Sequence, residues 1–448
     1  MKFVFDRLYL QMKFPPLIYD LLDCPGLLRL RDVRMANNQF HAFPAFANSS
    51  RYEHSLGVCY LAGICADYLQ LDEKDKLELM LAGLYHDVGT PPFAHAMEEV
   101  LKAQFGFDHE QNLKSLIIGD TGEFDQDFAQ VYLGQALKLK SICQGKKARG
   151  LGLDPHRVAR IAVGDRSEPL SALINGTGMD LDNIDNICRA VSAMGILDYK
   201  LNFAGLAKKL ASSFVLSNNQ IFYNANYKNE IALWLKLRDI QYTEIYRSLD
   251  DFSYQAMIKR AIWLLAKNIG NLGLEKNLWR LTDSEFTYEY LLKHSLSRPL
   301  MERVLLCKPY PILTLLYVSG AGVNHYINTH IRNIEEEVSK YIAEVVGLTR
   351  FADQDLVLAN FYPDKRYRKI AKERWTGNVG DFNKKDTNET EGAVLGFFTP
   401  GKVVGYATDR KSKQRGLRRF EKNNVPGLIR EVQSLLNKFE VNEYAKEK

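Results

Sequence analysis

The amino-acid sequence predicts a mainly α-helical protein with a helical core, an additional helical region and a small α+β part at the C-terminal end. Three observations support this fold class. Apolar residues recur at helical spacing from Gly57 to Leu84, the region from about 205 to 350 is rich in Leu, Ile and Tyr and continues the helical pattern, and short apolar runs bounded by Gly and Pro follow in the last hundred residues. With 448 residues, 46% of them hydrophobic and 25% charged, the chain is long enough for one large core or two to three domains.

Four regions follow from this pattern. We expect an N-terminal arm over residues 1–46 that packs against the site, a catalytic core over 47–200, a helical extension over 201–350 that completes the pocket, and a basic α+β region over 351–448. Strands are predicted in 354–363 and 392–407, with a hairpin turn around Pro400 and Gly401. The predicted helices cover residues 57–71, 77–86, 94–104, 112–118, 128–140, 155–163, 181–191, 242–267 and 325–346.

Composition narrows the function only a little. The net charge of +5 permits phosphate-bearing partners without requiring nucleic acid. The six cysteines show no CxxC spacing, which predicts free, buried thiols in a reducing compartment. We expect no membrane partner and a cytoplasmic location, because no apolar run approaches the roughly 18 residues of a membrane span and the N-terminus lacks the features of a signal peptide.

The most informative stretch runs from Ser50 to Glu110. Its segments SRYEHSLG, LYHDVGTPPFAH and DHEQN contain four of the nine histidines of the chain. Adjacent residues in a helix diverge by about 100°, so His86 and Asp87 can share an ion most easily at a helix end. We expect His54 to precede one helix and His86 to end the next, before the helix-breaking segment GTPP.

A second group of polar residues, DLDNID, contains Asp180, Asp182 and Asp185 at the start of a predicted helix. Helix capping with a solvated face and metal ligation explain these carboxylates equally well when they are taken alone. Combined with the histidines, they give a mixed nitrogen and oxygen ligand set that suits Mg, Mn, Fe or Zn. Such an ion lowers the pKa of bound water from about 15.7 towards neutrality, which predicts hydrolysis of a phosphoester or phosphoanhydride.

The segments RYEHSLGV, LAGLYHDVGTPPFAH, DHEQ and GMDLDNID together resemble the HD-domain phosphohydrolase superfamily, and within it the deoxynucleoside triphosphate (dNTP) triphosphohydrolases. The resemblance extends over about residues 15–260 and implies an HD-domain helical core. It implies a phosphate contact at Arg51 and a catalytic acid or base at His95, supported by His109 and Glu110, with Glu98 as the acid that follows the PFxH histidine. It also implies a divalent metal ion bound by His54, His86, Asp87 and Asp182.

The same comparison shows where this sequence departs from the family pattern. Thr90 stands where many relatives have a histidine, and the residues expected around the sugar and base are also replaced. The metal half of the pattern matches while the sugar half does not, so hydrolysis is better supported than the identity of the nucleotide. The replaced sugar-side positions are Met35, Asn183, Asn186 and Ala190.

We therefore expect a dNTP triphosphohydrolase that releases deoxynucleoside and inorganic triphosphate, with a role in nucleotide-pool control or phage defence. Two alternatives stay open: a phosphodiesterase or nuclease acting on oligonucleotides or cyclic nucleotides, and a nucleotide-sensing scaffold without turnover. The basic clusters at 364–374 and 409–422 fit a solvated helix face, an allosteric nucleotide site or a weak nucleic-acid track. The resemblance also implies a homo-oligomer.

Overall fold

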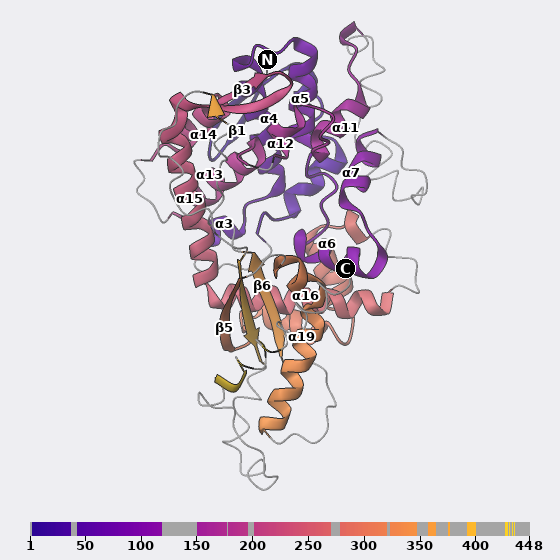
Figure 1. Cartoon of the computed structure of the whole chain (residues 1–448). Helices are drawn as coiled ribbons and strands as arrows, with labels where there is room; N and C mark the ends of the chain where they lie inside the picture. Colours follow the sequence, from indigo (N-terminus) through magenta and orange to yellow (C-terminus); the bar gives the residue numbers. More distant parts are fainter. Residues whose placement is uncertain are drawn as a thin grey trace, which may run out of the picture. The chain divides into compact units, whose positions relative to one another are not determined.

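A computed structural model describes the chain in two compact units (Figure 1). Unit 1 comprises Met1–Thr243, Ile262–Ser295 and Arg366–Lys385, and unit 2 comprises Glu244–Ala261, Leu296–Lys365 and Asp386–Lys448. The structure describes residues 2–36, 43–118, 150–176, 178–195, 201–269, 278–319, 323–346, 357–363, 375–376, 392–399, 426–428, 430, 432 and 434.

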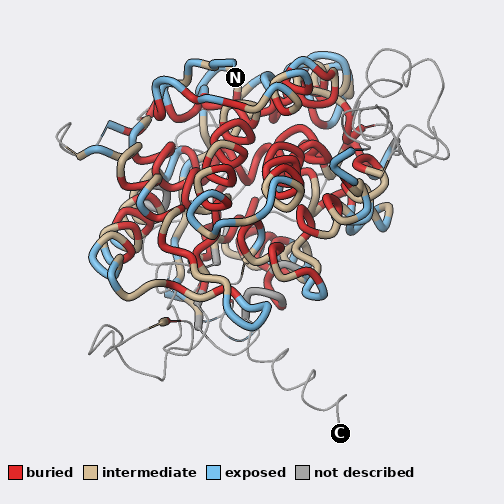
Figure 2. Tube along the Cα trace, turned by 90° about the horizontal axis from the view of Figure 1, so that it is seen from above, coloured by how far each residue is buried: buried red, intermediate tan, exposed pale blue. Residues whose placement is uncertain are grey.

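The centre of unit 1 is the helix pair α4 (Arg51–Tyr68) and α5 (Glu73–Tyr85), which pack against each other. Ser50 caps α4 in a capping box with Glu53, and Asp72 caps α5. Both helices are buried along most of their length (Figure 2), because apolar residues lie on several sides of each helix and pack against more than one neighbouring element.

Three further helices of unit 1 pack around this pair. Helices α13 (Leu181–Met194) and α14 (Phe203–Ala211) pack on α4, and α11 (Pro155–Val163) contacts both α5 and α7 (His109–Ile118). The helix α6 (His95–Phe105) follows the GTPP segment. The mainly α prediction is confirmed. The remaining described helices of the unit include α1 (Pro16–Tyr19), α2 (Pro25–Leu28), η1 (Arg29–Asp32), α3 (Pro44–Ala47), α12 (Ser171–Ile174), η3 (Ala225–Tyr227), η4 (Leu278–Arg280), α17 (Asp283–Glu285) and η5 (Phe286–Leu291).

The sequence did not predict the two small sheets of unit 1. Strands β1 (Lys2–Asp6) and β2 (Leu10–Phe14) form an antiparallel hairpin at the N-terminus. The second sheet has the order β3-β4-β7, from β3 (Phe214–Ser217), β4 (Gln220–Asn224) and β7 (Trp375–Thr376). Asn218 and Asn219 both have positive φ between β3 and β4, which is the two-residue turn that asparagine favours.

The predicted helix over 242–267 is wrong as a single element. Helix α15 (Lys228–Arg247) ends before Ser248, and α16 (Leu249–Ile269) begins after it. The Ser248 hydroxyl donates to Asp251 in the first turn of α16, and a serine at this position favours a helix start over a continuous helix.

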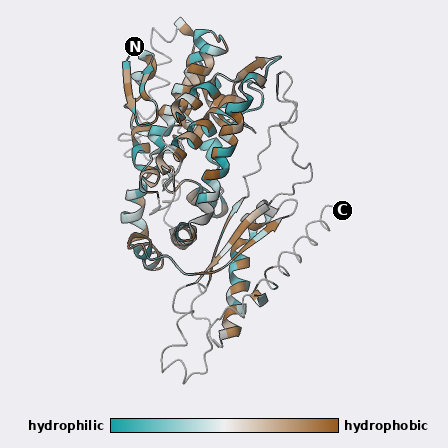
Figure 3. Cartoon of the chain, turned by 90° about the vertical axis from the view of Figure 1, so that its left-hand side faces the viewer, coloured by the Kyte–Doolittle hydropathy of each residue, from teal (hydrophilic) through white to brown (hydrophobic). Residues whose placement is uncertain are grey.

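Unit 2 contains a three-stranded antiparallel sheet with the order β5-β8-β6. Its strands are β5 (Ile312–Ser319), β8 (Gly392–Phe398) and β6 (Leu358–Pro363), and α19 (Val323–Val346) packs on β6 and β8. The apolar strands (Figure 3) and α19 share one core, and α18 (Arg298–Leu305) lies in the same unit. The expected α+β character is confirmed for β6 and β8, while β5 was not predicted.

Several sequence predictions fall outside the described residues. These are the helix over 128–140, the turn at Pro400–Gly401 and the basic clusters at 364–374 and 409–422. Among the described cysteines, Cys59, Cys65 and Cys188 are buried thiols, as predicted, and Cys24 is buried as well, whereas Cys307 is exposed. None of the described helices is long and apolar enough to cross a membrane.

Candidate metal centre

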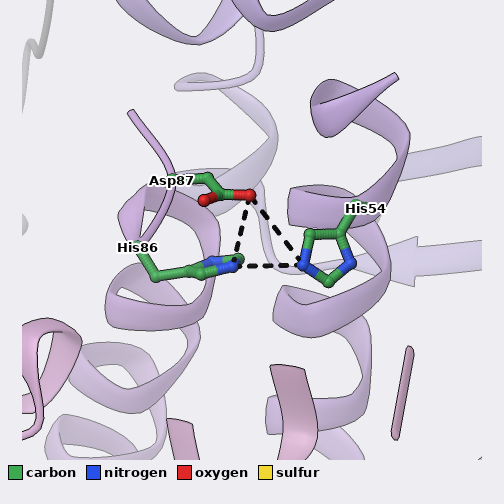
Figure 4. A group of neighbouring side chains, drawn as sticks. All are labelled: His54, His86 and Asp87. Carbon is green, nitrogen blue, oxygen red and sulfur yellow. Dashed lines mark hydrogen bonds and ion pairs between the residues drawn. The ribbon is translucent and has the colours of Figure 1, made fainter. Parts of the chain in front are cut away.

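Packing of α4 on α5 brings together three side chains that the sequence singled out, His54, His86 and Asp87 (Figure 4). One donor atom from each lies within 4.8 Å of the others. His86 ends α5 as its C-cap, as predicted. His54 lies in the first turn of α4 and does not precede it, because the helix already begins at Arg51 after the Ser50 cap.

Asp182 comes to the same place from the first turn of α13. Its Oδ1 lies 2.9 Å from His54 Nε2 and 3.8 Å from His86 Nε2. The Nε2 atoms of the two histidines are 3.2 Å apart. The structure thus gathers all four expected metal residues, and their two imidazoles and two carboxylates are a donor set that fits Mg, Mn, Fe or Zn.

The other ring nitrogen of each histidine is already engaged. His86 Nδ1 lies 2.9 Å from the carbonyl oxygen of Gly83, and His54 Nδ1 lies 2.7 Å from Asp185 Oδ2. A histidine that donates its Nδ1–H to an oxygen presents the lone pair of Nε2 to a metal. Both Nε2 atoms are therefore oriented for ligation before any ion binds.

Asp87 is held from two sides. Arg51 Nη1 donates to both of its carboxylate oxygens at 2.7 and 2.8 Å, and the Thr90 hydroxyl donates to Oδ1 at 2.9 Å. The Nε of Arg51 is buried and has no hydrogen-bond partner. Thr90 therefore supports the carboxylate of Asp87, one of the four expected metal residues.

The charges at this site are strongly coupled to one another. Burial alone would lower the pKa of His54, but hydrogen bonds and charges from Asp182 and Asp185 raise it to about 9. Burial alone would raise the pKa of Asp87, but Arg51 and the two histidines hold it well below the usual range of a carboxyl group. A divalent ion would compete with the proton on His54, as metals do with protons on their ligands.

The three aspartates of the DLDNID segment have three different environments. Asp180 caps α13 by accepting from the backbone N–H of Asn183 at 2.7 Å, and burial together with the charge of Asp182 raises its pKa to about 7. Asp182 faces the histidines, and Asp185 is fully buried behind His54. The capping interpretation is right for Asp180, whereas the solvated-face interpretation is wrong for Asp185.

A second, more open group surrounds His95 at the start of α6. His95 Nδ1 lies 2.9 Å from Glu98 Oε2, and His109 Nε2 lies 3.9 Å from Glu98 Oε1. The side chain of His95 is 79% exposed. Glu98 is thus the carboxylate that joins the two histidines, while Glu110 is exposed and makes no hydrogen bond or ion pair among the described contacts.

The segment between His86 and His95 is fastened to its surroundings by buried polar groups. Phe93 and Ala94 have positive φ angles of 55° and 43°, a conformation that costs non-glycine residues energy. Asp283 accepts from the backbone N–H of Phe93 at 2.9 Å. The Arg29 guanidinium donates to the carbonyl oxygens of Val88 and Thr90.

Several residues on the sugar side of the pattern are buried or already hydrogen-bonded to other side chains. Arg189, which directly precedes Ala190, is buried and paired with Asp185 and Asp6. Ala190 is buried, and Asn183 uses its side-chain amide on Asp180. The sequence analysis missed Asp6 and Tyr9 altogether, and the available signal for Arg189 was its i,i+4 spacing from Asp185.

Comparison with known proteins identifies one matching domain. The HD domain family model matches residues 51–126, the part that supplies His54, His86, Asp87 and the His95 group. This part of the chain thus matches an HD domain, and the chain resembles the HD-domain phosphohydrolases as its motifs predicted.

Two curated relatives are named as deoxynucleoside triphosphate triphosphohydrolases. The chain is 34% identical over 160 residues to the deoxynucleoside triphosphate triphosphohydrolase SAMHD1 homolog of Dictyostelium discoideum, covering 32% of this chain and 30% of that protein. It is 34% identical over 122 residues to the human SAMHD1 triphosphohydrolase, covering 25% of this chain and 19% of that protein. The chain thus spans less than a third of either curated relative.

Two further matches cover more of the chain. An uncharacterized protein of Mycoplasma pneumoniae, described as an MG461 homolog, is 24% identical over 269 residues, which is 58% of this chain and 57% of that protein. The crystal structure of a hypothetical protein from Aquifex aeolicus covers 92% of this chain and 99% of its own with a TM-score of 0.64 and 20% identity. This last similarity shows the fold alone.

Proposed function

We propose that this metal-dependent phosphohydrolase hydrolyses a deoxynucleoside triphosphate to the deoxynucleoside and inorganic triphosphate. The observation that carries the proposal is the convergence of His54, His86, Asp87 and Asp182, with both Nε2 atoms turned towards the shared space. The SAMHD1 triphosphohydrolases among the relatives support the choice of substrate class.

In this proposal, the four residues hold one divalent ion. When bound, such an ion supplies an activated water and polarises the phosphoryl group. Arg51, already beside Asp87, adds positive charge for the phosphate oxygens. Its buried Nε shows that the guanidinium is not yet saturated by the chain's own acceptors.

His95 acts as the general acid in this proposal. Because its Nδ1 is engaged with Glu98, Nε2 is the ring nitrogen that gives a proton to the departing 5′ oxygen. His109 lies on the other oxygen of Glu98 and helps to orient the carboxylate. From the resemblance we also propose a cytoplasmic homo-oligomer that is controlled by an allosteric nucleotide.

A substrate panel tests the proposal. The protein is incubated with Mn²⁺ against separate dNTPs, a dNTP mixture, NTPs, cyclic nucleotides and labelled oligonucleotides, and the products are separated by chromatography. We expect inorganic triphosphate from at least one dNTP or from the mixture, and no release by the His86→Ala and Asp182→Ala variants. Triphosphate release from none of the dNTP samples would refute the proposal.

The altered sugar side favours one second candidate, a phosphodiesterase. Arg189 is committed to buried carboxylates and Ala190 has no polar group to offer a 3′ hydroxyl, so a free deoxynucleotide has fewer expected contacts here. Shortened oligonucleotides or opened cyclic nucleotides without triphosphate would support this candidate. Tight nucleotide binding without any product would instead indicate a nucleotide sensor.

A further inference from the structure

We propose that Asp6 and Tyr9 of the N-terminal hairpin are positioning residues that set the metal affinity of the site, by holding His54 through Asp185 and Arg189. The inference rests on the proposed metal centre. It adds two residues that lie some 45 to 50 positions before the first ligand, Asp6 at the end of β1 and Tyr9 in the turn that follows.

The first link joins the ligand to a buried carboxylate. His54 Nδ1 lies 2.7 Å from Asp185 Oδ2, and the Asp185 side chain has no exposed surface. A metal-bound histidine whose second nitrogen donates to a carboxylate keeps its tautomer and ring orientation. The position of Asp185 therefore determines where His54 Nε2 points.

The second link fixes that carboxylate. Arg189 donates from Nε to Oδ2 at 2.9 Å and from Nη2 to Oδ1 at 3.0 Å, in the paired geometry that arginine forms with carboxylates. The Tyr9 hydroxyl donates to Oδ1 at 2.8 Å. With His54, both oxygens of Asp185 receive two partners each, so the carboxylate is constrained in the plane and about its axis.

The third link joins Arg189 to Asp6 of the hairpin. Asp6 Oδ2 accepts from Arg189 Nη1 at 2.8 Å, while Asp6 Oδ1 accepts from the backbone N–H groups of Leu8 and Tyr9 at 2.9 and 2.8 Å. One carboxylate thus shapes the turn between β1 and β2 and anchors the guanidinium. The turn that presents Tyr9 to Asp185 is tied to the same network.

The network has no free space on the side of α4. Gly57 lies one turn after His54, and a Cβ atom at this position would lie 2.0 Å from Asp185 Oδ1 and 2.7 Å from Arg189 Nη2. Only glycine lets the ion pair approach the helix so closely. This close packing indicates that the network is a fitted support for His54, in which each donor contributes to one geometry.

Removal of a single outer hydrogen-bond partner should therefore appear in metal binding before it appears in folding. Partners of this kind typically change metal affinity by about 10- to 100-fold. Tyr9→Phe deletes only the hydroxyl. Asp6→Asn keeps an oxygen for the turn but removes the charge that faces Arg189.

The test measures Mn²⁺ affinity of the full-length, metal-free protein by titration followed by electron paramagnetic resonance, together with the melting temperature of the metal-free protein. Tyr60→Phe is the matched control, because its ring lies 5.4 Å from that of Tyr9 while its hydroxyl is not among the donors to Asp185. We expect Tyr9→Phe and Asp6→Asn to weaken Mn²⁺ binding about tenfold or more. Tyr60→Phe should bind like the unmodified protein, and the melting temperature of metal-free Tyr9→Phe should match that of the control.

The outcomes separate this inference from the function on which it rests. Normal Mn²⁺ binding by the unmodified protein, lost in His86→Ala but unchanged in both hairpin variants, overturns only the role of the hairpin. Binding that is equal in the unmodified protein and in His86→Ala overturns the metal centre and this inference together. A loss of affinity that follows an equal loss of folded protein in Tyr9→Phe and Tyr60→Phe also overturns the positioning role.

Discussion

The two groups of histidines in the HD domain differ in how much of their geometry the chain itself provides. His54 is 1% exposed and has a protein partner at each ring nitrogen, whereas the His95 side chain is 79% exposed and has one hydrogen bond, to Glu98. The four expected metal residues lie on α4, at the C-terminal end of α5 and on α13, and hydrogen bonds through Asp185 and Arg189 link His54 to the hairpin. The His95 group lies on α6 and α7 and is open to solvent.

This difference separates two tasks. A metal site needs its ligands fixed before the ion arrives, because each misplaced ligand lowers affinity. A general acid must meet a substrate atom, so part of its surroundings has to come from the substrate. We therefore expect substitutions in the buried group to change metal affinity and turnover together, and substitutions in the open group to change turnover alone.

The largest effect should come from removal of a ligand. His86→Ala deletes one nitrogen donor, together with the hydrogen bond between His86 Nδ1 and the carbonyl oxygen of Gly83. We expect Mn²⁺ binding at this site to be lost and hydrolysis to fall by about a thousandfold or more, since the ion contributes several kcal/mol to the reaction. Parallel titration and product assays measure both quantities, and retained Mn²⁺ affinity would contradict the assignment of this ligand.

The next effect tests the open group. His95→Gln should lower the rate of hydrolysis by about 100- to 10,000-fold, because it removes the proton donor, and should leave Mn²⁺ affinity within about twofold of the original. His156→Gln, at an exposed position in the first turn of α11, is the matched control and should change neither quantity. Parallel losses of affinity and rate in His95→Gln would show that the two groups are not separate.

Sequence patterns singled out the four expected metal residues but not the residues that hydrogen-bond to them, and the physical reason is visible in particular residues. His86 and Asp87 are adjacent at the end of a periodic helix, and the apolar spacing after Gly57 predicted a second helix close to His54, although that helix begins earlier, at Arg51. Their meeting follows from the packing of two consecutive helices. The mainly α fold and most helix positions were predictable because apolar residues at helical spacing are a local signal in the sequence.

The supports depend on pairing across long sequence distances. Asp6 and Arg189 are 183 residues apart, and each alone has the appearance of an ordinary surface charge. Periodicity did not predict the hairpin that carries Asp6 and Tyr9, because two five-residue strands give a weak alternating signal. Gly57 likewise resembles any helical glycine until the ion pair behind it is known.

Gly57 provides the third test of the comparison. Gly57→Ala places a methyl group against the Asp185–Arg189 pair, so we expect a loss of about 1 to 3 kcal/mol in stability and weaker Mn²⁺ binding. Gly63→Ala on the same helix is the matched control, since its Cβ would meet only the flexible side chain of Met80 at 3.2 Å. Urea unfolding of the metal-free variants compares the two. Equal stability of both would mean that the network has room to rearrange.

The smallest effect concerns the residue that most clearly departs from the family pattern. Thr90→Val keeps the shape of the side chain but removes the hydroxyl that donates to Asp87 at 2.9 Å, while the Arg51 contacts to the same carboxylate remain. Loss of one hydrogen bond to a charged group costs about 1.5 kcal/mol, which corresponds to roughly tenfold in Mn²⁺ affinity. Thr90→Ser retains the donor and should bind Mn²⁺ almost normally. If Thr90→Val also binds normally, then Arg51 alone fixes Asp87 and the threonine has only a packing role. A tenfold loss that Thr90→Ser restores would show instead that the threonine hydroxyl helps to hold Asp87 in place for metal binding.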